Sequence, residues 1–226
     1  MHETNMGASG MRNLKVDVFS DPVCPWCLVG LARLDQAVSA LADDVKVTIE
    51  HHPFFLDPNA PIKGEDVVAM LKRKYGRDPF EMWDRIELEA RASGVELDMR
   101  KQKTRHASQP AQALIGAAGA KGTQHELAKA IGNACYLEGL NIADPQVLVH
   151  LATAHGFDAD EAHAIVVDKG RWRSIEQAAA SAAGQGIQGV PFFIFENKYA
   201  LSGCQPLEVF TQVLNTVLEQ ADQTGR

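Results

Sequence analysis

The chain has 226 residues, of which 46% are hydrophobic and 23% are charged, and its formal net charge is −7. This length and composition are typical of an ordinary globular protein whose hydrophobic core needs no covalent support. The negative charge and the absence of a long Lys/Arg run argue against nucleic acid as a partner, because phosphate contacts require clustered positive charge. A short basic stretch, RKQKTR at residues 100–105, is expected to be a solvated loop.

No stretch of the sequence approaches the roughly 20 apolar residues that span a membrane, so we expect no membrane partner. The opening residues, MHETNMGASGMRN, contain no apolar segment of the kind found in secretory signals. Four cysteines are too few for the disulfide framework of a secreted protein. Together these features favour a cytoplasmic location.

A strand, a helix and a second strand are predicted at the start of the chain. Residues 14–20, LKVDVFS, alternate apolar and polar side chains, which is typical of a strand. From Pro25 to Leu41 the apolar residues recur every three or four positions and indicate an amphipathic helix. Residues 43–52, DDVKVTIEHH, alternate again. A β-α-β unit of this kind pairs its two strands in parallel.

Helices alone are predicted between the second strand and residue 183. Helices are expected over 64–75, 79–93 and 108–121, with an Ala-rich helix over 172–183. Between them, a Thr-x-x-Glu capping box at Thr123 and Glu126 opens one helix, and Asp144-Pro145 starts the next. Asp158 with Glu161 starts another helix, and Gly156 and Gly170 are expected to end the helices around it. Strand patterns return only in residues 190–195, VPFFIF, and 199–203, YALSG, which predict an antiparallel hairpin.

We therefore predict an α/β domain formed by residues 12–60 and 171–226, interrupted by an all-helical insertion over residues 61–170. A last amphipathic helix, beginning at Leu207, closes the α/β domain. The sequence carries no signal for a particular oligomeric state.

The candidate site is the Cys-Pro-Trp-Cys motif of residues 24–27, which follows the first strand. Pro25 is expected at the first helical position, which makes Cys24 the N-cap. Its sulfur would then face the unpaired amides of Trp26 and Cys27, and these donors, with the helix dipole, favour a thiolate. We expect Cys24 to be an exposed nucleophile and Cys27, one turn into the helix, to be a buried resolving thiol.

A metal site and a static disulfide are the alternative interpretations of the cysteine pair. A zinc site needs a second close pair of ligands, whereas Cys135 and Cys204 are isolated and His51 and His52 point to opposite faces of a strand. A chain of this size does not need a structural disulfide. We therefore expect no metal and a redox-active dithiol, with Cys135 in the core and Cys204 either a small filler or an accessory thiol.

The element order and the motifs DPVCPWC and GVPFF resemble the thioredoxin fold in its DsbA-type form. The segments SDPVCPWCLVG, HHPFFLDPNAP, EGLNIAD, GIQGVPFFIF and YALSGCQP are similar to the FrnE-type branch of DsbA-like oxidoreductases. The resemblance covers residues 14–218, and it implies a thioredoxin fold with a large helical insertion and an active dithiol of Cys24 and Cys27. It also implies a cis Pro191, with the backbone of Val190 available to an extended peptide.

The resemblance implies thiol–disulfide oxidoreductase or disulfide isomerase activity without a cofactor beyond the Cys24–Cys27 pair. The expected partners are extended segments of protein thiols or disulfides, contacted by Pro25, Trp26 and Val190, and glutathione is a candidate co-substrate. For Trp26, simple packing is an equal alternative to substrate contact. Two other functions stay open. One is a glutathione-dependent transferase or 2-hydroxychromene-2-carboxylate isomerase-like enzyme, which needs only one thiol. The other is a peptide-binding chaperone. Cys204 departs from the family, which has a small non-thiol residue at that position.

Overall fold

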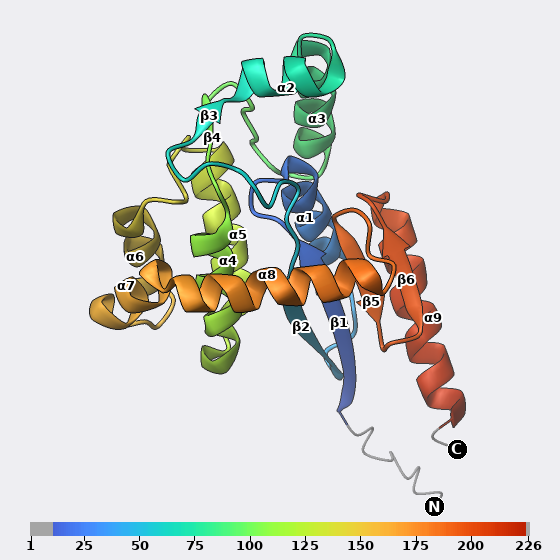
Figure 1. Ribbon diagram of the computed structural model, residues 1–226. Helices are drawn as coiled ribbons and strands as arrows, with labels where there is room; N and C mark the ends of the chain where they lie inside the picture. The colour runs from blue at the N-terminus through green and yellow to red at the C-terminus, as the bar shows by residue number, and fades with distance from the viewer. Residues whose placement is uncertain (1–10, 225–226) are drawn as a thin grey trace, which may run out of the picture.

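The computed structural model describes residues 11–224. The expectation that residues 1–13 carry no secretory signal therefore concerns positions that lie almost wholly outside the described part. A four-stranded sheet forms the centre of one half of the molecule (Figure 1). Its strand order is β2 (Val45–Pro53), β1 (Arg12–Ser20), β5 (Phe192–Phe195) and β6 (Tyr199–Ser202). As predicted, β1 and β2 are parallel, and β5 and β6 form an antiparallel hairpin.

Helices α1 (Pro25–Ser39) and α9 (Leu207–Thr224) pack together against β1 and β5, while α8 (Lys169–Gly184) crosses in front of the sheet in Figure 1. The alternating residues of β1 point into the core that these elements share, because successive side chains of a strand face opposite ways. The buried members of this core are Leu14, Val16, Val18, Leu31, Leu34, Ala37, Phe193, Phe195, Phe210, Leu214, Val217 and Leu218. This core fixes the start of α1 beside the start of β5.

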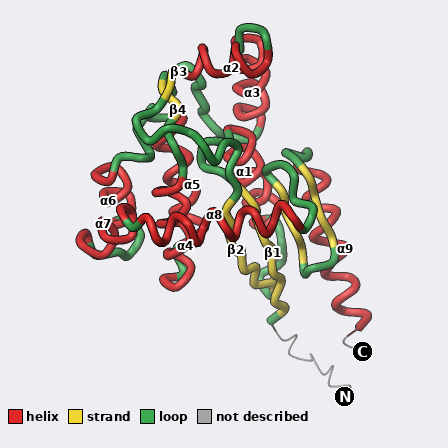
Figure 2. The backbone as a smooth tube through the Cα atoms, in the orientation of Figure 1, coloured by secondary structure: helices red, strands yellow, loops and turns green. Residues whose placement is uncertain are grey.

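The segment between β2 and α8 forms a second, mainly helical body with its own hydrophobic core. It contains α2 (Val67–Tyr75), α3 (Phe80–Ala92), α4 (Gln109–Ala118), the short 3-10 helix η1 (Gly119–Lys121), α5 (Gln124–Tyr136), α6 (Pro145–Thr153) and α7 (Ala159–Val167). The expectation of an all-helical insertion is wrong in one detail, because β3 (Glu65–Asp66) pairs with β4 (Thr104–Arg105). Figure 2 shows this pair apart from the main sheet. Two residues per strand are too few to produce an alternating pattern. The exact limits of the insertion, 61–170, stay a prediction.

The helix starts show which capping predictions hold. Asp144 caps α6 and Asp158 caps α7 with a full capping box, as predicted. The box at Thr123 is wrong, because its hydroxyl donates to the carbonyl of His155 instead of capping α5. Gly170 does not end a helix, since Asp168 accepts hydrogen bonds from Gly170 and Arg171 and starts α8 there. Among residues 11–224, no helix has both the length and the apolar character of a membrane span.

Gly30 lets α1 approach the loop that leads into β5. A Cβ atom at this position would lie 3.0 Å from Cγ of Pro191 and 3.2 Å from Cζ of Phe193. Both distances are shorter than ordinary van der Waals contact, so a larger residue would push the loop away. The absence of a side chain at Gly30 thus brings the loop before β5 close to the first turns of α1.

A buried hydrogen-bonded chain ties β2 to α5 and α1. The backbone of His51 exchanges two hydrogen bonds with the side-chain amide of Gln124, at 2.9 and 3.1 Å. Nε2 of His51 lies 2.9 Å from Nδ1 of His125, whose Nε2 lies 2.7 Å from Asp35. Burial, followed by the charge of His125, lowers the pKa of His51 to about 3. His51 is therefore neutral in the folded protein over the whole range in which free histidine titrates.

We predict that acidification destabilises the protein through His51. The unfolded chain takes up a proton at the ordinary histidine pKa of 6.5, whereas the folded chain does so only near 3. The unfolded state therefore binds more protons between these values, and the free energy of unfolding falls as the pH falls, by about 1.4 kcal/mol per pH unit. Urea unfolding between about pH 7 and about pH 4 measures this slope.

His51→Gln should flatten the slope, and His150→Gln, which changes an exposed histidine of α6, should leave it unchanged. An equal slope in wild-type protein and His51→Gln would show that another group is responsible.

Candidate active site at the start of α1

The turn between β1 and α1 is held by the buried carboxyl group of Asp21. One carboxyl oxygen accepts a hydrogen bond from the amide of Val23 at 3.2 Å, and the other accepts one from the amide of Leu56 at 2.9 Å. The carbonyl of Asp21 also accepts from the amide of Cys24 at 2.8 Å. Burial raises the pKa of Asp21, and these hydrogen bonds oppose the rise. The turn that precedes the cysteines is thereby fixed to the exit of β2.

Cys24 is the N-cap of α1, with Pro25 following at the first helical position, as predicted. Its sulfur accepts no hydrogen bond from the first-turn amides of α1, contrary to expectation, and lies 3.9 Å from the carbonyl oxygen of Val190. The expected exposure is also wrong, because Cys24 is only 4% exposed. The helical insertion covers this end of α1, so the sulfur reaches solvent through a cavity instead of lying on an open surface.

Cys27 lies one turn into α1 and is 3% exposed, which confirms its predicted burial. Both Cys24 and Cys27 are free thiols in the structure. Burial raises the pKa of Cys27 well above its ordinary value, and the hydrogen bond with Cys24 raises it further. The two sulfurs therefore differ in surroundings: Cys24 borders a cavity, and Cys27 is a protonated thiol enclosed behind it.

The loop before β5 faces Cys24. The Val190–Pro191 peptide bond is cis, as the resemblance implied. Pro191 is buried and its carbonyl accepts from the amide of Gly203 at 2.8 Å, whereas Val190 is half-buried and borders the same cavity as Cys24. β5 begins only at Phe192, so Val190 lies outside the sheet. The structure thus brings Cys24, Cys27, Val190 and Pro191 together.

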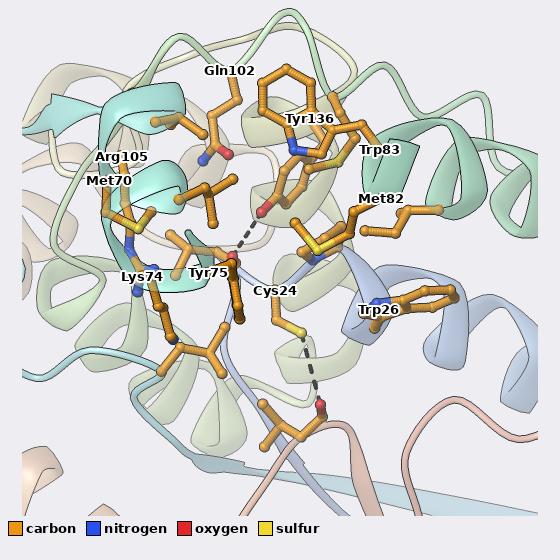
Figure 3. Close-up of a pocket in the computed structure, with 18 residues that line it drawn as sticks. Cys24, Trp26, Met70, Lys74, Tyr75, Met82, Trp83, Gln102, Arg105 and Tyr136 are labelled. Atoms are coloured by element: carbon orange, nitrogen blue, oxygen red, sulfur yellow. Dashed lines mark hydrogen bonds between the residues drawn. The ribbon is translucent and has the colours of Figure 1, made fainter. Parts of the chain in front are cut away.

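A cavity of about 210 Å³ separates Cys24 from the helical insertion (Figure 3). Cys24 lies at its base below Tyr136, with Arg105 and Lys74 to one side. Pro25 and Trp26 also border it, and Trp26 packs against the core of the insertion as well. Both interpretations of Trp26 therefore remain compatible with its position.

Most residues of this cavity were not predicted as site residues, and among them Tyr136, Gln102 and Arg105 are buried polar residues. Tyr136 of α5 donates a hydrogen bond to the carbonyl of Val23 at 2.7 Å and so anchors the turn before Cys24 from the insertion. Gln102 and Arg105 border the cavity and are buried, so the expectation that residues 100–105 form a solvated loop is wrong for these two. Their polar character predicts exposure, and only the packing of the insertion turns them inward.

The other two cysteines differ in their surroundings. Cys135 is buried on α5, as predicted, and burial raises its pKa to about 12. The amide of Gln102 lies 2.9 Å from its sulfur. Cys204 is half-buried, with Nη1 of Arg33 3.5 Å from its sulfur, and burial raises its pKa to about 11. It does not border the cavity next to Cys24.

A group of possible metal ligands lies away from the cysteines. Ligand atoms of Asp17, Glu50 and His52 lie within 4.8 Å of one another. The ammonium group of Lys15 lies 2.8 Å from Asp17 and 2.7 Å from Glu50, and it already supplies a positive charge to both carboxylates. The cluster is explained as an ion-pair network on β1 and β2 that is centred on the buried Asp17.

Known proteins resemble the chain over nearly all of its length. A crystal structure of a probable DsbA oxidoreductase from Streptomyces coelicolor has 31% sequence identity and a TM-score of 0.82, with 91% of this chain and 90% of that chain covered. The cytosolic disulfide reductase DsbM from Pseudomonas aeruginosa with GSH has 20% identity and a TM-score of 0.65, over 91% of this chain and 99% of that chain. A 2-hydroxychromene-2-carboxylate isomerase has 15% identity and a TM-score of 0.70, over 93% and 98%.

The last two similarities concern the fold, since their sequence identities are low. They agree with the predicted thioredoxin fold with a helical insertion, which is confirmed. The family model of the DSBA-like thioredoxin domain matches residues 15–215, and the chain belongs to that family.

Proposed function

We propose that this protein is a thiol–disulfide oxidoreductase that acts through Cys24 and Cys27. The observation that carries the proposal is the arrangement of the two thiols. Cys24 caps α1, borders a cavity and faces Val190, while Cys27 lies enclosed one turn further on. A nucleophile next to a protected second thiol is what a two-step exchange through a mixed disulfide requires.

In the proposed reaction, the thiolate of Cys24 attacks one sulfur of a substrate disulfide and displaces the other sulfur as a thiolate. A mixed disulfide between Cys24 and the substrate results. Cys27 then attacks the Cys24 sulfur, its proton passes to the first leaving thiolate, and the second substrate thiolate departs. Two electrons have moved from the protein to the substrate, and the protein holds a Cys24–Cys27 disulfide. An external dithiol, or glutathione as co-substrate, returns this disulfide to the two thiols.

Extended segments of protein thiols or disulfides are the proposed substrates. The backbone of Val190 lies outside the sheet and next to Cys24, where a strand-like segment could add its own hydrogen bonds. Pro25 and Trp26 border the same opening and would contact the segment. The same exchange steps allow isomerisation when the substrate disulfide re-forms elsewhere. We propose the cytoplasm as the location and no cofactor beyond the cysteine pair; the cytosolic DsbM provides a precedent in the fold.

A glutathione-dependent transferase or 2-hydroxychromene-2-carboxylate isomerase-like activity is the second candidate, because an isomerase of that name shares the fold. A one-thiol mechanism gives Cys27 no role, although Cys27 lies in hydrogen-bond contact with Cys24. A peptide-binding chaperone, the third candidate, would need neither thiol. Single cysteine substitutions distinguish these three candidate functions.

We predict that Cys24→Ser lowers the rate of insulin disulfide reduction at least about 1,000-fold, because the attacking sulfur is lost. Cys27→Ser should instead accumulate a mixed disulfide at Cys24, since nothing releases the bound substrate. Mass spectrometry of the trapped species identifies the linkage. Cys204→Ser is the matched control and should retain activity.

Full activity in Cys24→Ser would reject the oxidoreductase proposal. Full activity in Cys27→Ser, together with tight glutathione binding, would favour the one-thiol enzyme. Peptide capture without either thiol would favour the chaperone.

We predict that alkylation of Cys27 begins only at a pH well above that of an ordinary thiol. Its pKa is raised by burial and by Cys24, so the unreactive protonated form persists where a free thiol is already ionised. The pH midpoint of iodoacetamide labelling at Cys27, followed by peptide mass spectrometry, measures this. The midpoint, unlike the absolute rate, separates ionisation from restricted access. A midpoint equal to that of the unfolded chain would contradict the prediction.

A further inference from the structure

Two buried N–H groups at the cavity beside Cys24 have no hydrogen-bond partner within residues 11–224. They are Nε1 of Trp83, a residue that is 3% exposed, and Nε of Arg105, a residue that is 8% exposed. In Figure 3 the indole nitrogen of Trp83 lies on the edge of the ring nearer Tyr136. A buried donor without an acceptor costs free energy, so each of these two donors points to a missing acceptor in the cavity.

The guanidinium of Arg105 also lacks a counter-ion in the described part of the chain. It forms none of the ion pairs found within 4.0 Å there. Burial raises the pKa of Asp21 and the positive charge of Arg105 opposes that rise, but these two described residues form no ion pair. The Asp21 carboxylate instead accepts hydrogen bonds from the amides of Val23 and Leu56. No Asp or Glu is among the residues that border the cavity, whereas Lys74 adds a second positive charge at its edge. A buried charge is stable only when paired, so the cavity is suited to an anion.

Most of the remaining cavity wall is apolar, although Gln102 and the two tyrosines also border it. The apolar part includes Met70, Leu71, Met82, Ile86 and Met99. The volume of about 210 Å³ exceeds that of the ~150 Å³ apolar cavity that holds a benzene molecule. One ring or a short branched chain therefore fits. Glutathione, which is polar along its whole length, would leave its own amide and ammonium groups unpaired against these side chains.

We infer that this cavity binds a small monocarboxylate with an aromatic or branched aliphatic body. Its carboxylate pairs with Arg105, and its apolar body packs against the methionines. Because Cys24 forms the base of the same cavity, low-molecular-weight disulfides of this chemical class are substrates of the dithiol. The binding itself is independent of redox chemistry, and the statement about substrates rests on the proposed function.

Binding is tested on the wild-type protein with phenylacetate and, as a neutral analogue, phenylacetamide, by calorimetric titration. Phenylacetate should bind at least about tenfold more tightly, and Arg105→Gln should weaken phenylacetate about 10- to 100-fold while leaving phenylacetamide unchanged, because one charge-assisted contact is lost. Arg85→Gln removes the same charge from an exposed position of α3 and is the control. Equal binding of the two probes, no binding of either, or no effect of Arg105→Gln would overturn the inference.

A stability measurement supplies a second, independent readout. Arg105→Met removes an unpaired buried charge and keeps the apolar stem, so the melting temperature of the ligand-free protein should rise. Arg85→Met should change it little. A fall in the melting temperature of Arg105→Met would show that the guanidinium is already satisfied without a ligand, and would overturn the inference.

The substrate statement is tested with a single turnover of the reduced protein. Arg105→Gln should slow the reaction with dithiobis(nitrobenzoate), an aromatic carboxylate disulfide, at least about tenfold relative to the reaction with neutral dipyridyl disulfide. Equal slowing with both disulfides would refute the substrate class. Wild-type rates no faster than those of Cys24→Ser would refute the proposed function, while the phenylacetate titration still decides whether the anion site exists.

Discussion

The hydrogen bonds that Asp21 accepts at the end of β1 determine where both sulfur atoms lie. The carboxyl group joins the turn before Cys24 to the backbone after β2, and Tyr136 holds the same turn from the opposite side through the carbonyl of Val23. The start of α1 is therefore fixed by the sheet and by the insertion at once. Because buried polar groups are costly when unpaired, loss of either partner would release the turn and with it the dithiol.

The insertion changes the kind of site that the thioredoxin fold provides. A dithiol at the start of α1 would otherwise lie on an open edge, but α2, α3 and α5 close over it and leave a cavity. Cys24 is consequently buried but still borders the cavity that a substrate could enter, while Cys27 is buried one turn further along α1. The two halves of the molecule therefore have different roles. The α/β half positions the sulfurs, and the insertion shapes what can reach them.

Local patterns predict most of the framework and little of the cavity. The alternation of β1 and β2, the periodicity of α1 and the caps at Asp144 and Asp158 depend on near neighbours, and they are confirmed. Burial of Cys24 depends on residues far along the chain, so the motif alone predicts exposure. Arg105 shows the same limit: a basic stretch predicts solvation, whereas β4 pairs with β3 inside the insertion and Arg105 is buried there. Thr123 carries a capping pattern, yet its hydroxyl is used by a loop that follows a later helix.

Cys24 and Cys27 are expected to form one reversible disulfide. Equilibration of the protein in glutathione buffers of increasing oxidation, followed by acid quenching and peptide mass spectrometry, tests it most directly. We expect a single intramolecular bond between residues 24 and 27, with Cys135 and Cys204 remaining thiols throughout. A stable glutathione adduct at residue 24 in place of that bond, or a bond from residue 24 to residue 204, would contradict it.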